Sequence, residues 1–95
     1  MKPLWKVRSG NFAGWRSNDL LYDGGGNNVG YFKSDVAYST KGYYIGEIYR
    51  DDWIGKKTSG GHSLGRPHAA HAGIAQAAHA GRAGLAIAGW EDPEF

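Results

Sequence analysis

Short apolar segments alternate with polar, glycine-containing segments through the first 58 residues. Residues 20–22 read as a strand that runs into a turn at Gly26, and residues 28–32 read as the strand that returns. Lys33-Ser34-Asp35 then favours a second turn, because aspartate and serine side chains bond nearby backbone groups. Residues 36–38 begin the next strand. The pattern therefore predicts consecutive hairpins.

Three columns of identical residues recur at a spacing of 16. They are Gly10, Gly26 and Gly42; Gly14, Gly30 and Gly46; and Asp19, Asp35 and Asp51. The first column suits turns that require a positive φ. Glycine inside a strand usually marks a bulge, a sharp bend or a close backbone approach, so the second column predicts a regular bend.

The fold class expected from this repeat is all-β, an antiparallel meander of 16-residue hairpins across residues 1–57. A meander leaves two unpaired edge strands, which native proteins protect by closure or cover. With about three and a half units, one chain looks too short to close a barrel alone. We therefore expect several copies to assemble about a symmetry axis.

The composition changes at Thr58. Residues 58–66 read as a linker, and residues 67–95 form a tail rich in alanine, glycine and histidine. From Pro67 to Trp90, 14 of 24 residues are alanine or glycine, and glycines recur every eight residues. Two structures compete for it. A helix over 67–80 capped by Gly81, or coil, is favoured, and a tightly packed extended segment is the alternative. Partial disorder of the tail also stays open.

Two large apolar residues, Trp90 and Phe95, flank three acids at the end of the chain. A C-terminal anchor docked on the β domain is the favoured interpretation of this pair. A short recognition motif for another protein is the alternative.

Composition narrows the possibilities further. The chain has no cysteine, which removes disulfides and thiolate chemistry, and a cytoplasmic location fits best. No segment approaches the roughly 20 apolar residues of a membrane span. The formal charge of +2 is small and its basic residues form no run, so a nucleic-acid partner is not expected. We expect neither a cofactor nor enzyme activity, because nucleophile-elbow and phosphate-loop motifs are missing.

Eleven of the 13 aromatic residues lie between Trp5 and Trp53. Most should be core or interface, since aromatic side chains carry large apolar areas. If some are exposed on a sheet face, they would bind a glycan, a peptide or a nucleic-acid base. The candidates for that site are Trp15, Tyr31, Tyr43 and Tyr44.

Histidines supply the main candidate metal site. His68 and His71 are three residues apart and His79 follows eight later, so a helical tail would place them near one face. Imidazoles in such an arrangement bind zinc, copper or nickel. Their spacing matches no zinc signature, and hydrogen-bonded or solvated histidines are the simpler interpretation.

The run Leu21-Tyr22-Asp23, Val29-Gly30-Tyr31, Tyr44-Ile45-Gly46 and Trp53-Ile54-Gly55-Lys56 resembles the bacterial 4-fold β-flower proteins, over residues 4 to 57. The resemblance implies a homotetramer and brings no catalytic residues with it. The function expected first is a non-enzymatic, homo-oligomeric β scaffold or binding module. A ligand-binding module that uses exposed aromatics is the alternative, and a metal-dependent enzyme is a third.

Overall fold

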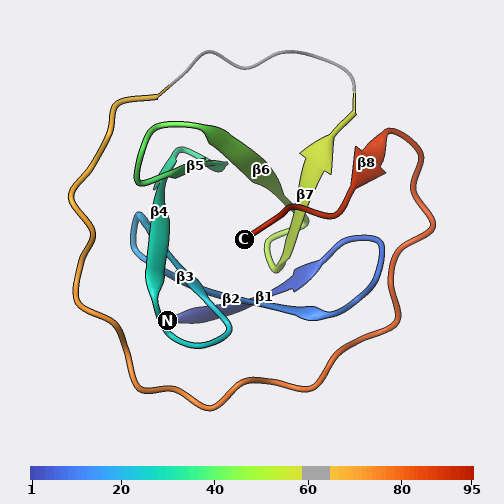
Figure 1. The fold of residues 1–95 in the computed structure, drawn as a ribbon. Coiled ribbons are helices and arrows are strands. Elements are labelled where there is room, and N and C mark those ends of the chain that lie inside the picture. The colour runs from blue at the N-terminus through green and yellow to red at the C-terminus, as the bar shows by residue number, and fades with distance from the viewer. Residues whose placement is uncertain (59–64) are drawn as a thin grey trace.

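A closed seven-strand β-barrel forms the body of the protein in the computed structural model, which describes residues 1–58 and 65–95 (Figure 1). Its strands are β1 (Lys2–Lys6), β2 (Phe12–Ser17), β3 (Leu20–Asp23), β4 (Asn28–Lys33), β5 (Val36–Ser39), β6 (Tyr44–Tyr49) and β7 (Trp53–Lys57). Each strand pairs antiparallel with the next. The predicted all-β meander is confirmed.

The barrel closes within one chain, so the expectation that closure needs several copies is wrong. β1 and β7 pair in parallel, with Trp5 beside Trp53 and Lys6 beside Ile54. A meander with an odd number of strands places its first and last strands in the same direction, so parallel closure follows from the count. Closure leaves neither β1 nor β7 as a free edge there, and the edge argument for assembly no longer applies.

Bulges bend three of the hairpins at the predicted strand glycines. The residue just before each glycine has no partner in the register: Ala13, Val29 and Ile45. At Gly14, an added Cβ would lie 1.9 Å from the carbonyl oxygen of Tyr22 in the next strand. These bulges sharpen the curvature of short strands, which lets seven of them close a small barrel.

The glycine column in the longer loops faces one end of the barrel. Gly10, Gly26 and Gly42 have φ values of 76°, 85° and 91°, as their predicted turn role requires. The shorter turns lie at the opposite end, and two of them are the two-residue turns at Asn18-Asp19 and Ser34-Asp35. We call the first set the glycine loops.

Apolar side chains fill the barrel interior, as expected for a barrel of this size. The buried cluster comprises Leu4, Ala13, Leu21, Phe32, Ala37, Ile45 and Ile54. Val29, Ile48 and Phe95 pack against it while partly exposed.

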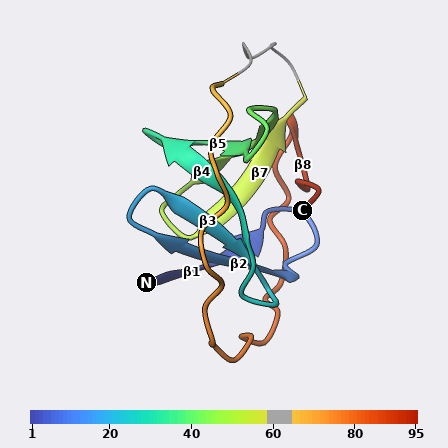
Figure 2. The same ribbon diagram turned by 60° about the vertical axis from the view of Figure 1, so that its left-hand side comes forward.

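Residues 65–89 form an extended segment, here called the belt, which runs outside the strands around the barrel (Figures 1 and 2). Among the described residues, five belt amides donate to carbonyl oxygens of the barrel at 2.7–2.8 Å. The donors are Gly65, His68, Ile74, Arg82 and Leu85, and the acceptors, in the same order, are Gly42, Thr40, Gly26, Gly10 and Val7.

The predicted helix over 67–80 is therefore wrong, and the extended alternative holds. Alanine and glycine are too small to give a helix a large apolar face to bury. The carbonyl groups of the glycine loops, in contrast, bond the belt along its extended path. The part of the chain that the structure describes contains no helix with the length and apolarity of a membrane span.

Arg82 and Trp5 fix the second half of the belt. The Arg82 guanidinium carbon lies 3.5 Å from the centre of the Trp5 ring, and Nη1 pairs with Asp52 Oδ2 at 2.9 Å. The Trp5 indole N–H donates to the carbonyl oxygen of Ala80 at 2.8 Å. The basic side chain thus joins the belt to β1 and to the turn that precedes β7, where these two strands pair.

The chain ends inside the ring that the belt makes in Figure 1. Strand β8 (Trp90–Glu91) pairs antiparallel with the last residues of β7. Asp92 then accepts from the backbone N–H groups of Arg8 and Ser9, Pro93 is fully buried, and Phe95 packs against the core. This is the docked arrangement rather than a free recognition motif. Residues 59–64 of the predicted linker lie outside the described residues.

Candidate ligand-binding groove

A groove of about 700 Å³ lies where the start of the belt crosses β3, β4 and β5. Its apolar wall is formed by Leu20, Tyr31, Phe32 and Tyr38. Its polar rim is formed by Asp19, Lys33, Arg66, His68 and His71, and Gly65 completes the lining. Barrel and belt therefore both contribute to this site.

The paired tyrosines of the wall follow from the short turn between β4 and β5. A two-residue turn at Ser34-Asp35 places Tyr31 directly opposite Tyr38. The two rings stack with centroids 5.6 Å apart and planes at 23°. Tyr31 is 8% exposed and Tyr38 is half-buried, so Tyr38 carries most of the pair's surface toward solvent.

Hydrogen bonds hold the belt against this wall. The Tyr31 hydroxyl donates to the Arg66 carbonyl oxygen at 2.6 Å. The backbone N–H of His71 donates to Asn28 Oδ1 at 2.9 Å, and the His68 ring lies 4.0 Å from the Tyr31 ring. Because both flanks of the groove are bonded, its shape exists before any ligand arrives, which lowers the entropic cost of binding.

Positive charge dominates the rim. Lys33 and Arg66 are exposed there, and within the described ranges no acidic side chain forms an ion pair with either. The one acid of the rim, Asp19, lies 3.6 Å from Arg16 Nη2, which offsets part of its charge. The two histidines add ring nitrogens that can bond a polar ligand.

The four aromatic residues predicted to bind ligand do not share one surface. Tyr31 lines the groove, whereas Trp15 is 2% exposed and packs against Phe12, with ring centroids 4.8 Å apart. Tyr43 is 59% exposed in the loop before β6 and lies outside the groove lining. Tyr44 begins β6 and is partly buried.

Tyr44 instead belongs to a polar cluster between β6 and the end of β7. Its hydroxyl donates to Glu47 Oε2 at 3.0 Å and accepts from the backbone N–H of Lys57 at 3.3 Å. Burial, followed by the bond to Glu47, raises the pKa of Tyr44 to about 12. The phenol is thus held neutral at ordinary pH and acts as a structural donor.

Of the three histidines proposed as metal ligands, His68 and His71 both lie against β4 in the groove, and His79 lies apart from them. His68 lies on Tyr31, and the His71 amide bonds Asn28. His79 sits among Trp5, Phe12 and Trp15, at centroid distances of 5.8, 5.4 and 6.4 Å. In residues 1–58 and 65–95 we find no group of three histidine, cysteine or acidic side chains able to hold a metal.

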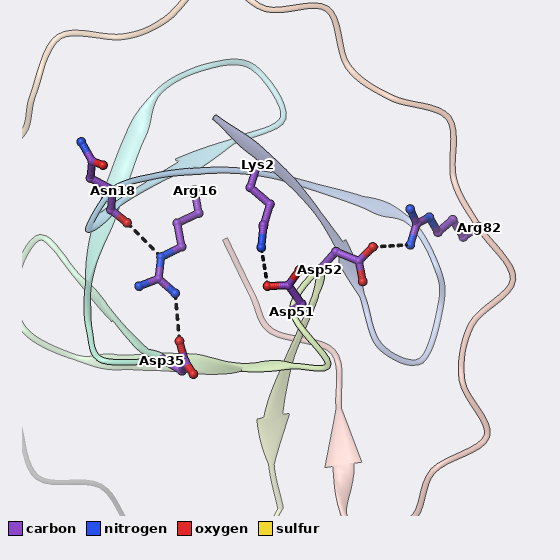
Figure 3. A network of polar contacts seen from close by, with 7 residues as sticks. All are labelled: Lys2, Arg16, Asn18, Asp35, Asp51, Asp52 and Arg82. Carbon is purple, nitrogen blue, oxygen red and sulfur yellow. Dashed lines mark hydrogen bonds and ion pairs between the residues drawn. The ribbon is translucent and has the colours of Figure 1, made fainter.

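A second cavity, of about 580 Å³, lies at the end of the barrel opposite the glycine loops. Lys2, Arg16, Asp35 and Asp51 line it, and Figure 3 shows how they pair. Arg16 Nη1 contacts Asp35 Oδ1 at 3.1 Å, and Lys2 pairs with Asp51. These four charges pair with one another, and Arg50, which also lines the cavity, lies over the Tyr49 ring. Of the residues that the structure describes, no aromatic one is in the lining, so this cavity offers a flat ligand less than the groove does.

Sequence reasoning missed most of the groove. Tyr38, Lys33 and Arg66 were not among the expected ligand residues. A usable signal for Tyr38 was present, because a two-residue turn fixes the cross-strand partner of Tyr31. Arg66 gave no such signal, since its position depends on the path of the belt.

Comparison with known proteins does not assign the chain. No family model matches it, and neither does any curated protein or any solved structure.

Proposed function

We propose that this protein is a non-enzymatic binding module and that the groove between the belt and strands β3–β5 is its ligand site. The observation that carries the proposal is the combination of a preformed apolar wall with a cationic rim. Pockets that bind small ligands are mostly apolar and carry a few convergent polar groups, which is the composition of this groove.

The lining favours a small anionic ligand with a flat ring. Tyr38 and Leu20 present apolar surface against which a ring packs. Lys33 and Arg66 stand at the rim, where a phosphate or carboxylate would meet them. An uncharged sugar would use the wall and leave these two cations unpartnered, so the charge of the rim favours the anion.

A titration followed by amide NMR tests the proposal on the 95-residue chain. Adenosine monophosphate supplies a ring with an anion, adenosine the ring alone, and inorganic phosphate the anion alone. We expect the monophosphate to bind most tightly, with shifts centred on Lys33, Tyr38 and Arg66. Shifts spread evenly over the surface, or none at all, would contradict the proposal.

Two exposed lysines provide a matched pair of variants. Lys33→Ala removes a rim charge, which should weaken the monophosphate by about fivefold, the equivalent of roughly 1 kcal/mol. Lys41→Ala removes the same charge in the loop before β6, outside the groove lining. It should leave the affinity unchanged. Equal losses in both variants would point to nonspecific attraction.

Self-association as a homotetramer and a cytoplasmic location are also proposed. The first is implied by the β-flower resemblance, and the second is supported by the cysteine-free sequence. In such a tetramer, four copies of the groove would be presented together. Native mass spectrometry of the untagged protein tests this, with a monomer at all concentrations as the contrary result.

A further inference from the structure

Two periodic patterns meet where the belt crosses the glycine loops. The loop glycines recur every 16 residues, and each accepts one belt hydrogen bond through its carbonyl oxygen. The donors, Gly65, Ile74 and Arg82, are spaced nine and eight residues apart along the belt. The belt passes the loops in reverse order, so successive belt units contact successive hairpins.

The contact surface is backbone against backbone. A Cβ at Gly10, Gly26 or Gly42 would lie 1.7, 2.1 or 2.3 Å from a belt carbonyl oxygen, so a side chain there would block the belt. On the belt side, the neighbouring residues are mostly alanine and glycine. The loops therefore form a docking line that recognises a narrow extended chain.

The C-terminal arm, residues 65–95, behaves as a separate element. Within the described ranges, every hydrogen bond, ion pair and ring contact of the arm joins it to residues 1–58. The arm has no fold of its own that would be lost if it changed barrels. A second copy's arm can form the same bonds, the same β8 pairing and the same Phe95 contact.

We propose that the docking line accepts the arm of a second copy, so that concentrated protein exchanges arms and forms interlocked oligomers. Each barrel keeps the same contacts after the exchange, so the main free-energy cost is the entropy lost when two chains associate. Swapping an identical element is therefore a low-cost route to oligomers. At low protein concentration each barrel binds its own arm, because the covalent link holds that arm at a higher effective concentration than the arms of other copies. The proposal is independent of the ligand groove and of the β-flower resemblance.

Cysteine pairing tests the exchange, because the chain contains no cysteine of its own. A Cβ at Gly81 would lie 3.9 Å from the Cα of Asn11, so the two positions adjoin across the docking line. The double variant Asn11→Cys plus Gly81→Cys, oxidised when dilute, should form an intramolecular disulfide. Failure to do so would contradict the placement of the arm and overturn the proposal.

The decisive sample mixes the two single variants, N11C and G81C, one of them isotopically labelled. They are unfolded together in urea, refolded at increasing total concentration and then oxidised. Disulfide-linked N11C–G81C dimers, counted by mass, should exceed the dimers of a mismatched mixture several-fold and increase with concentration. The mismatched mixture pairs N11C with S34C, whose cysteine lies in a turn at the opposite end of the barrel. Equal yields from the two mixtures at the highest concentration would overturn the proposal.

Discussion

Replacing Gly26 by alanine should release the belt from the barrel. The new Cβ would lie 2.1 Å from the carbonyl oxygen of Ile74, far inside van der Waals contact. The substitution also carries a backbone cost, since Gly26 has a φ of 85° and a left-handed alanine costs roughly 1–2 kcal/mol. Gly89→Ala isolates that cost, because Gly89 has a φ of 81° and no atom within 4 Å of the added Cβ.

The difference in the free energy of unfolding between these two variants measures how much the docking contact stabilises the protein. Gly26→Ala forfeits the bond from the Ile74 N–H, which spans 2.8 Å, and should cost about 1 kcal/mol more than Gly89→Ala. Urea unfolding followed by tryptophan fluorescence gives the two free energies. Trypsin provides a local readout, because cleavage after Arg82 should be faster in Gly26→Ala than in Gly89→Ala. Equal free energies and equal cleavage rates would refute the docking of the belt on Gly26.

Two other predictions concern the C-terminus and Tyr44. Phe95→Ala should lower the free energy of unfolding by about 2 kcal/mol, because Phe95 packs on the core while partly exposed. The matched control is Glu94→Ala, at an exposed position, which should change this free energy by less than about 0.5 kcal/mol. Urea titrations of both variants check this, and equal losses would contradict the docked terminus. Tyr44 has a pKa of about 12 in the folded protein against an ordinary value of 10. Its contribution to the free energy of unfolding is therefore complete below pH 10 and is lost as the pH rises to 12. After allowance for solvent screening, the free energy of unfolding of the wild type should fall by about 1 kcal/mol more than that of Tyr44→Phe between pH 10 and pH 12. Parallel stability curves for the two proteins between pH 10 and pH 12 would contradict the shift.

The meander of hairpins could be predicted from local signals, and the belt could not. Gly26 and Gly30 each carry a conformational requirement that is visible in the sequence, a positive φ in one case and a bulge in the other. The belt contains no comparable requirement. Its alanines favour a helix when considered alone, and its extended form depends on carbonyl groups of Gly10 and Gly42 that are distant in the chain.

Closure of the barrel within one chain could not be predicted for a related reason. The number of hairpin units does not show how strongly three bulges curve the short strands. The pairing of Trp5 with Trp53, which closes the barrel, therefore could not be predicted from that number. Only a small part of the groove could be predicted from the sequence. Tyr31 was selected as an aromatic strand residue, but its partners at the rim, such as Arg66, come from the belt.

Amide hydrogen exchange shows whether the belt lies on the barrel, which the groove and the docking line both require. The amides of Gly65, Ile74 and Arg82 bond the glycine loops and should exchange well below the rate of an unstructured peptide. Exchange at the unstructured rate at all three positions, with the strands of the barrel still protected, would contradict it.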